Sequence, residues 1–168
     1  KYMSYRRLPR WLSAKIIAFY DYQWYLLRGV DEQRFLSELP QTLQVRVSQV
    51  MRRDVVRSVP ILRKVNHAML NAITECVETY VYSPGDEIVN NGELLRGVVM
   101  VSRVEVDVLN KRGDTVESKL KRCDHYGEDC LFDEVKSKNV LKAKTYTEIL
   151  VLSALAFQNV LKAQCSPR

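Results

Sequence analysis

The feature that most constrains the fold is a change in the spacing of apolar residues at Val77. Before it, apolar residues recur at the spacing of one face of an α-helix. After it, Val77, Thr79 and Val81 alternate with Glu78, Tyr80 and Tyr82. Alternation is typical of strands with one buried face. We therefore expect helices followed by short strands, which is an α+β fold.

The first helix is expected to begin near Pro9, because proline is tolerated in the first turn of a helix. Gly29 is expected to end it, and its apolar stripe consists of Leu12, Ile16, Phe19, Tyr20 and Leu27. Four aromatic residues lie off this stripe: Trp11, Tyr22, Trp24 and Tyr25. Aromatic side chains around a helix indicate that it contacts partners on more than one side.

Shorter helices are expected between this helix and Val77. Asp31 caps one that carries Phe35, Leu36 and Leu39. Pro40 begins another, with Arg46, Arg52 and Arg53 turned away from a stripe of Leu43, Val47, Val50 and Met51.

Asp54 to Val59 is expected to form a separate short helix that Pro60 ends. Asn66 caps a last helix, with one side made of Met69, Leu70, Ile73, Cys76 and Val77. The helices up to this point have no thick core of their own. We interpret them as an adaptor that packs on copies of the same chain.

The second half is expected to contain seven or eight short antiparallel strands joined by turns. Residues Val140 to Leu152 supply one or two of them, and Ser153 caps a terminal helix with Phe157, Val160 and Leu161. The predicted fold is a helical region over residues 1–64 and a jelly-roll-like β-roll with flanking helices over residues 65–168.

Composition excludes several classes of protein. No apolar run approaches the ~20 residues of a membrane span. The four cysteines and two histidines lack the spacing of a zinc site, so we predict no metal site and reduced, mostly buried thiols. No catalytic triad and no triphosphate-binding glycine loop is evident, so we predict no catalytic residues and no enzyme.

Charge is concentrated in the first half of the chain. The net charge is +6, and residues 1–75 hold 13 Lys and Arg against 6 Asp and Glu. Such a basic half is open to two interpretations: contact with nucleic acid or anionic lipid, or solvated helix faces.

The second half carries motifs that resemble cyclic-nucleotide-binding domains. Pro84-Gly85-Asp86-x-Ile88-Val89-x-x-Gly92 resembles their turn-and-strand signature. His125 to Leu131, with Gly127-Glu128-x-Cys130-Leu131 and the later Ala143-x-Thr145-Tyr146, resembles their phosphate-binding cassette.

The first half resembles the C-linker of tetrameric channels. The similarity lies in Leu8-Pro9, the helix rich in Tyr and Trp, Asp31-Glu32 and the Leu39 to Met51 helix. This linker precedes the roll in hyperpolarization-activated, cyclic-nucleotide-gated and ether-à-go-go-type channels. The resemblance implies a cytosolic module below a cation-channel pore, either potassium or mixed-cation. Its linker helices would assemble a homotetramer or heterotetramer and connect to the channel's own transmembrane domain. The chain lacks an initiator Met, so we expect a fragment whose membrane-embedded part lies outside it.

Several positions depart from the family pattern. The cassette's phosphate-binding arginine and the Thr or Ser after it correspond to Ser137 and Lys138. Lys138 or Lys136 would supply a charge without the two-pronged fit of a guanidinium. Asp129, Asp133 and Glu134 oppose an anionic ligand. Val104 stands at a position in a strand turn where the family usually has glycine. The family's lid helix would begin after Pro167, so we expect it to be absent from this chain.

The resemblance implies a binding site for cyclic AMP or cyclic GMP, weakened or lost, and no other cofactor. Its candidate residues are Gly127, Glu128, Asp129, Cys130, Ser137 and Lys138. Glu128 either accepts from a ribose 2′-hydroxyl or caps backbone N–H groups, and Lys138 is either a phosphate ligand or a solvated lysine. His125 is interpreted as a polar loop residue. Cys130 is interpreted as a small buried one.

Two other functions stay open at this point. One is a soluble cyclic-nucleotide-responsive regulator whose basic helical half contacts nucleic acid, although no helix-turn-helix follows the roll. The other is a scaffold without a small ligand, in which the roll only holds subunits together.

Overall fold

The computed structural model describes residues 5–27 and 36–165. The chain divides into two compact units, residues 1–45 and residues 46–168. The boundary that the sequence suggests between residues 64 and 65 stays a prediction.

The main element of the first unit is helix α2 (Arg10–Leu27). Pro9 precedes it, and the Pro9 carbonyl accepts the Ser13 N–H at 3.0 Å, as expected for proline at a helix start. Two of the aromatic side chains off the predicted stripe are largely exposed, Trp11 at 66% and Trp24 at 72%, and Tyr22 is partly buried. In the part of the chain that the structure describes, no helix is long and apolar enough to cross a membrane. Residues Asp31 and Phe35 of the predicted second helix lie outside the described residues.

Helix α4 (Gln41–Ser58) is one continuous helix, so the predicted break at Asp54 is wrong. No proline or glycine lies between its ends, and an uninterrupted backbone ladder propagates through Asp54. The predicted apolar stripe is also displaced. Leu43, Val50 and Met51 are exposed, whereas Val55, Val56 and Val59 at the end of the helix are buried. The reason is that the core of the second unit lies at that end.

A 3₁₀ helix, η1 (Pro60–Lys64), leads to α5 (His67–Glu75). The Asn66 side chain accepts the Met69 N–H at 2.8 Å, which confirms the predicted cap. Leu70 and Ile73 are buried as predicted, but Cys76 at the end of the helix is exposed.

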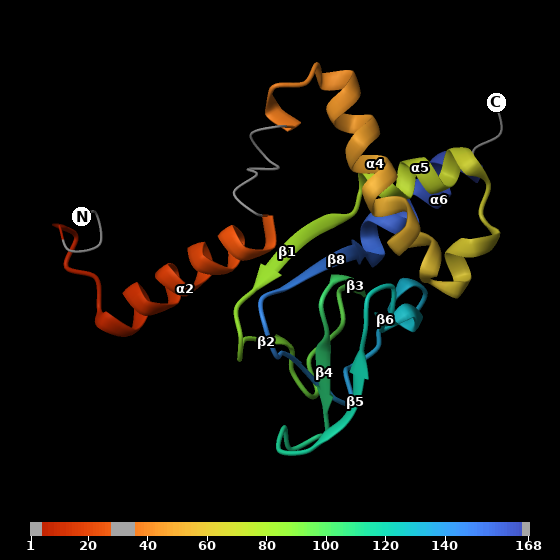
Figure 1. Ribbon diagram of the computed structural model, residues 1–168. Helices are drawn as coiled ribbons and strands as arrows, with labels where there is room; N and C mark the ends of the chain where they lie inside the picture. The colour runs from red at the N-terminus through yellow and green to blue at the C-terminus, as the bar shows by residue number, and fades with distance from the viewer. Residues whose placement is uncertain (1–4, 28–35, 166–168) are drawn as a thin grey trace. The chain divides into compact units, whose positions relative to one another are not determined.

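Eight strands of the described chain form two four-stranded antiparallel sheets (Figure 1). One has the order β1 (Glu78–Tyr82), β8 (Thr147–Ser153), β3 (Gly97–Arg103) and β6 (His125–Tyr126). The other has the order β2 (Glu87–Val89), β7 (Val140–Ala143), β4 (Val106–Leu109) and β5 (Val116–Leu120). This confirms the predicted α+β class, a helical region followed by a β-roll.

The core joins strands to helices. Met100, Leu150 and Leu152 from the first sheet are fully buried, as is Leu141 from the second. Helix α6 (Ala154–Cys165) follows β8 directly, contributes Phe157, and packs on α5 and on the cassette (Figure 1).

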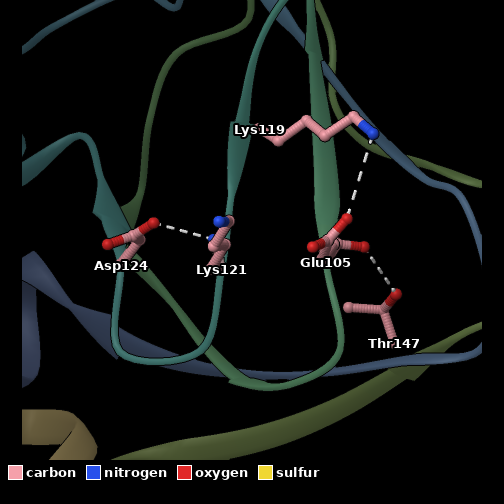
Figure 2. Close-up of polar contacts among 5 residues, drawn as sticks. All are labelled: Glu105, Lys119, Lys121, Asp124 and Thr147. Carbon is pink, nitrogen blue, oxygen red and sulfur yellow. Dashed lines mark hydrogen bonds and ion pairs between the residues drawn. The ribbon is translucent and has the colours of Figure 1, made fainter.

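The β3–β4 turn holds an unusual backbone conformation. Val104 has a φ of 70°, in the left-handed region that β-branched residues rarely adopt. Figure 2 shows the contacts that tie the following residue in place: the Thr147 hydroxyl donates to the Glu105 carbonyl oxygen at 3.3 Å, and Lys119 Nζ lies 4.0 Å from the Glu105 carboxylate. These contacts join the residue after Val104 to β8 and β5.

Candidate functional site

The candidate site begins where β6 ends. Gly127 has a φ of 79°, and a Cβ at this position would lie 2.7 Å from Leu95 Cδ1. Both the backbone angle and the lack of space favour glycine. The predicted close backbone approach at Gly127 stays a prediction, because the nearest neighbour is the Leu95 side chain.

Gly127 leads into a 3₁₀ turn, η2 (Glu128–Leu131). The Cys130 N–H donates to the Gly127 carbonyl at 3.1 Å, and the Phe132 N–H donates to the Asp129 carbonyl at 3.1 Å. Cys130 is buried, and burial raises the pKa of its thiol to about 11, with a further contribution from the Asp129 charge. A thiol with this pKa is protonated at neutral pH, which supports its interpretation as a packing residue.

Glu128 lies at the start of this turn and approaches His125. The distance from Glu128 Oε2 to His125 Nε2 is 3.3 Å, within the range of an ion pair when the imidazole is protonated. Oε2 is buried and makes no hydrogen bond of good geometry. The Glu128 side chain as a whole is 32% exposed. Its exposed surface therefore belongs to atoms other than Oε2.

Ser137 occupies the position at which the resemblance expects arginine, and it is buried, with 3% exposure. Its N–H donates to the Glu93 carbonyl at 2.8 Å, and its carbonyl accepts the Gly92 N–H at 2.8 Å. Its hydroxyl donates to the Asn139 carbonyl at 2.7 Å and lies 2.9 Å from the Tyr126 hydroxyl. All the polar groups of Ser137 are thus engaged within the protein.

Asn139 extends these contacts to the second sheet. Its side-chain amide donates to the Leu109 carbonyl at 3.0 Å and to the Glu117 carboxylate at 2.7 Å. We call Tyr126, Ser137 and Asn139 the hydroxyl network. It joins β6 to the loop before β7 and is a feature that sequence reasoning missed.

Charged side chains of both signs surround this network. Lys136 and Lys138 are exposed, and so are the acidic residues Asp129, Asp133 and Glu134. The structure brings Gly127, Glu128, Asp129 and Cys130 together on one turn, and it links Ser137 to that turn through Tyr126. Lys138 follows Ser137 on the surface. Among residues 5–27 and 36–165, no group of three or more His, Cys, Asp or Glu side chains is placed to hold a metal ion.

No family model matches the chain. Comparison with curated proteins gives three informative relatives. The chain is 26% identical to a cyclic nucleotide-gated channel of Caenorhabditis elegans, over 96% of the chain and 23% of that protein. It is 29% identical to a cyclic nucleotide-gated cation channel protein of Drosophila melanogaster, over 76% of the chain and 19% of that protein. It is 28% identical to the human potassium/sodium hyperpolarization-activated cyclic nucleotide-gated channel 2, over 96% of the chain and 18% of that protein.

These relatives confirm the resemblance to the linker and cyclic-nucleotide-binding region of this channel superfamily. The chain spans about a fifth of the length of the relatives it matches.

Proposed function

We propose that this chain is the cytosolic gating region of a cation channel. The observation that carries the proposal is that similarity to channels covers 96% of the chain, both its helical region and its roll. In this proposal residues 1–64 form the linker, residues 65–168 form the sensor roll, and neither part is an enzyme. Movement of the roll shifts the linker, and the linker biases the pore.

Assembly with copies of the chain is part of the proposal. Trp11, Ile17, Tyr20 and Trp24 on α2 expose large apolar surfaces, as do Leu43 and Val50 on α4. Apolar surfaces of this kind usually meet a partner. A closed tetramer through the linker, continuous with the channel's own transmembrane domain, would cover them.

We propose that the turn after Gly127 is the cyclic-nucleotide site and that its affinity is low. Glu128 accepts from the ribose 2′-hydroxyl, and backbone N–H groups of the turn with Lys138 face the cyclic phosphate. Ser137 contributes no guanidinium, and its hydroxyl is already bonded to Asn139. A hydrogen bond to a charged group contributes about 1.5–3 kcal/mol, so its loss weakens binding by about one to two orders of magnitude.

Calorimetric titration with cyclic AMP and cyclic GMP tests the site. The wild-type chain is expected to bind with a Kd well above micromolar, and Ser137→Arg is expected to bind about 10–100-fold more tightly. Ser137→Ala is the matched control, because it removes the hydroxyl network without adding a cation and therefore gives no gain. Micromolar binding by the wild type would refute the weakened site.

Recording from the full-length channel tests the gating role. Cyclic nucleotide applied to the cytosolic side is expected to change the open probability only slightly in the wild type and more strongly in Ser137→Arg. A Ser137→Arg chain that gains affinity in calorimetry but leaves channel opening unchanged would separate the sensor from the gate and contradict the proposed coupling.

A further inference from the structure

His125 is held rigidly next to the candidate ribose contact. It lies on β6, where it pairs in register with the buried Met100 of β3. The residues before it are fixed by two backbone hydrogen bonds of 2.9 Å, from the Val101 N–H to the Asp124 carbonyl and from the Cys123 N–H to the Val101 carbonyl. The backbone at His125 is therefore held by its neighbours in the sheet.

The carboxylate nearest to His125 in the chain is engaged elsewhere. Asp124 accepts the Lys121 N–H at 2.7 Å and closes the turn before β6 (Figure 2). Glu128, three residues after His125, instead brings Oε2 to 3.3 Å from Nε2. The side chains of His125 and Glu128 are only partly exposed, at 24% and 32%.

The two oxygens of Glu128 have different surroundings. Oε2 is buried, and it lacks a hydrogen bond of good geometry. Leaving a buried carboxylate oxygen without a donor is costly, and the Nε2 group of His125 is a donor within reach. Pairing with His125 would fix the carboxylate plane and direct Oε1 away from the protein interior.

We infer that His125 is a positioning residue for ribose recognition: it holds Glu128 through Oε2 so that Oε1 accepts the 2′-hydroxyl of a cyclic nucleotide. This inference rests on the proposed function, because it assumes that Glu128 contacts the ribose. The contact between His125 and Glu128, by contrast, is observed without any assumption about the ligand.

The test compares cyclic AMP with 2′-deoxy-cyclic AMP in NMR titrations that extend to millimolar ligand. His125→Gln retains an N–H donor at about the same reach, and His125→Met has a similar length without the donor. The wild type and His125→Gln are expected to prefer the ribose form by about tenfold. His125→Met is expected to lose most of this preference while its affinity for the 2′-deoxy form is unchanged. Glu128→Gln is expected to lose the preference as well.

The two failures are distinguishable. If His125→Met binds cyclic AMP and keeps the wild-type preference, the positioning role is refuted and the proposed site stands. If the wild-type chain binds neither nucleotide at millimolar concentration, the proposed site fails and the positioning role fails with it.

A second measurement needs no ligand. Urea unfolding of His125→Met, Glu128→Gln and the double variant gives the coupling between the two side chains. A coupling above experimental error supports the pair. A coupling of zero overturns the inference whatever the nucleotide titrations show.

Discussion

The conformation of Val104 allows a quantitative prediction about the roll. At a φ of 70° its Cβ is strained, and the left-handed region costs an ordinary L-residue about 1–2 kcal/mol. Val104→Gly removes this strain but adds about 0.4–1 kcal/mol of backbone entropy to the unfolded chain. It also removes a valine side chain that is 36% exposed and thus partly buried. Comparison with the wild type alone would mix these three effects.

Val104→Ala is the control that separates them. It removes most of the same side chain but keeps the Cβ and hence the strain. Val104→Gly gains the relieved strain energy and loses the backbone-entropy term, whereas Val104→Ala does neither. The free energy of unfolding of Val104→Gly should therefore exceed that of Val104→Ala by about 0.5–1 kcal/mol. For a chain of this size that difference corresponds to roughly 1–4 °C in Tm.

The assay is urea unfolding followed by circular dichroism, with thermal melts in parallel. Val104→Asn should fall between the two variants, because asparagine tolerates the left-handed region better than alanine does. An alanine variant as stable as the glycine variant would show that the turn relaxes, and the reasoning from φ would then be wrong.

Four further predictions concern Cys130, Gly97 and Asn66. With a pKa of about 11, the Cys130 thiol should be about 0.1% ionised at pH 8. Iodoacetamide should therefore label the exposed Cys76 far faster than it labels Cys130, and peptide mass spectrometry can measure both rates. Because the pKa of Cys130 is raised in the folded state, its contribution to the free energy of unfolding should be constant below about pH 9 and fall as the pH approaches 11. Urea titrations at each pH measure this loss, and Cys130→Ala should not show it. Gly97→Ala should destabilise the roll by about 1–3 kcal/mol, since its Cβ would lie 2.9 Å from the Leu152 carbonyl carbon; an unchanged urea midpoint would contradict the close β3–β8 approach. Asn66→Ala should cost about 1 kcal/mol through loss of the α5 cap, and Asn66→Asp should retain most of it, both read from thermal melts.

The parts of the fold that follow local rules were predictable. The start of the strands after Val77 and the cap at Asn66 depend on residues within a few positions of each other, and both were predicted. The buried face expected for the first strand is wrong, because Val81 is 52% exposed. The buried stripe of α4 was not, because the packing core lies against Val55 and Val56 rather than along the whole helix. Amphipathic spacing shows which residues share a face, but it does not show how far along the helix that face is covered.

In the candidate site, too, features set by local sequence were predictable and features set by contacts between distant residues were not. Gly127 was predictable because a turn that favours glycine has a recognisable sequence context. The hydroxyl network was not, because the Ser137 hydroxyl meets that of Tyr126 across 11 positions, and serine and tyrosine occur in many unrelated environments. The contact between His125 and Glu128 spans only three positions but depends on the tight turn at Gly127, which a residue pattern does not specify.

The hydroxyl network has a consequence for signalling. Hydrogen bonds within the protein hold the end of the loop that precedes Val140: the Ser137 hydroxyl meets the Tyr126 hydroxyl, and the Asn139 amide donates to the Leu109 carbonyl. A ligand shifts a conformational equilibrium only by its difference in affinity for the two states. Under the proposed function, a nucleotide that rearranges this loop would therefore have to offset these hydrogen bonds.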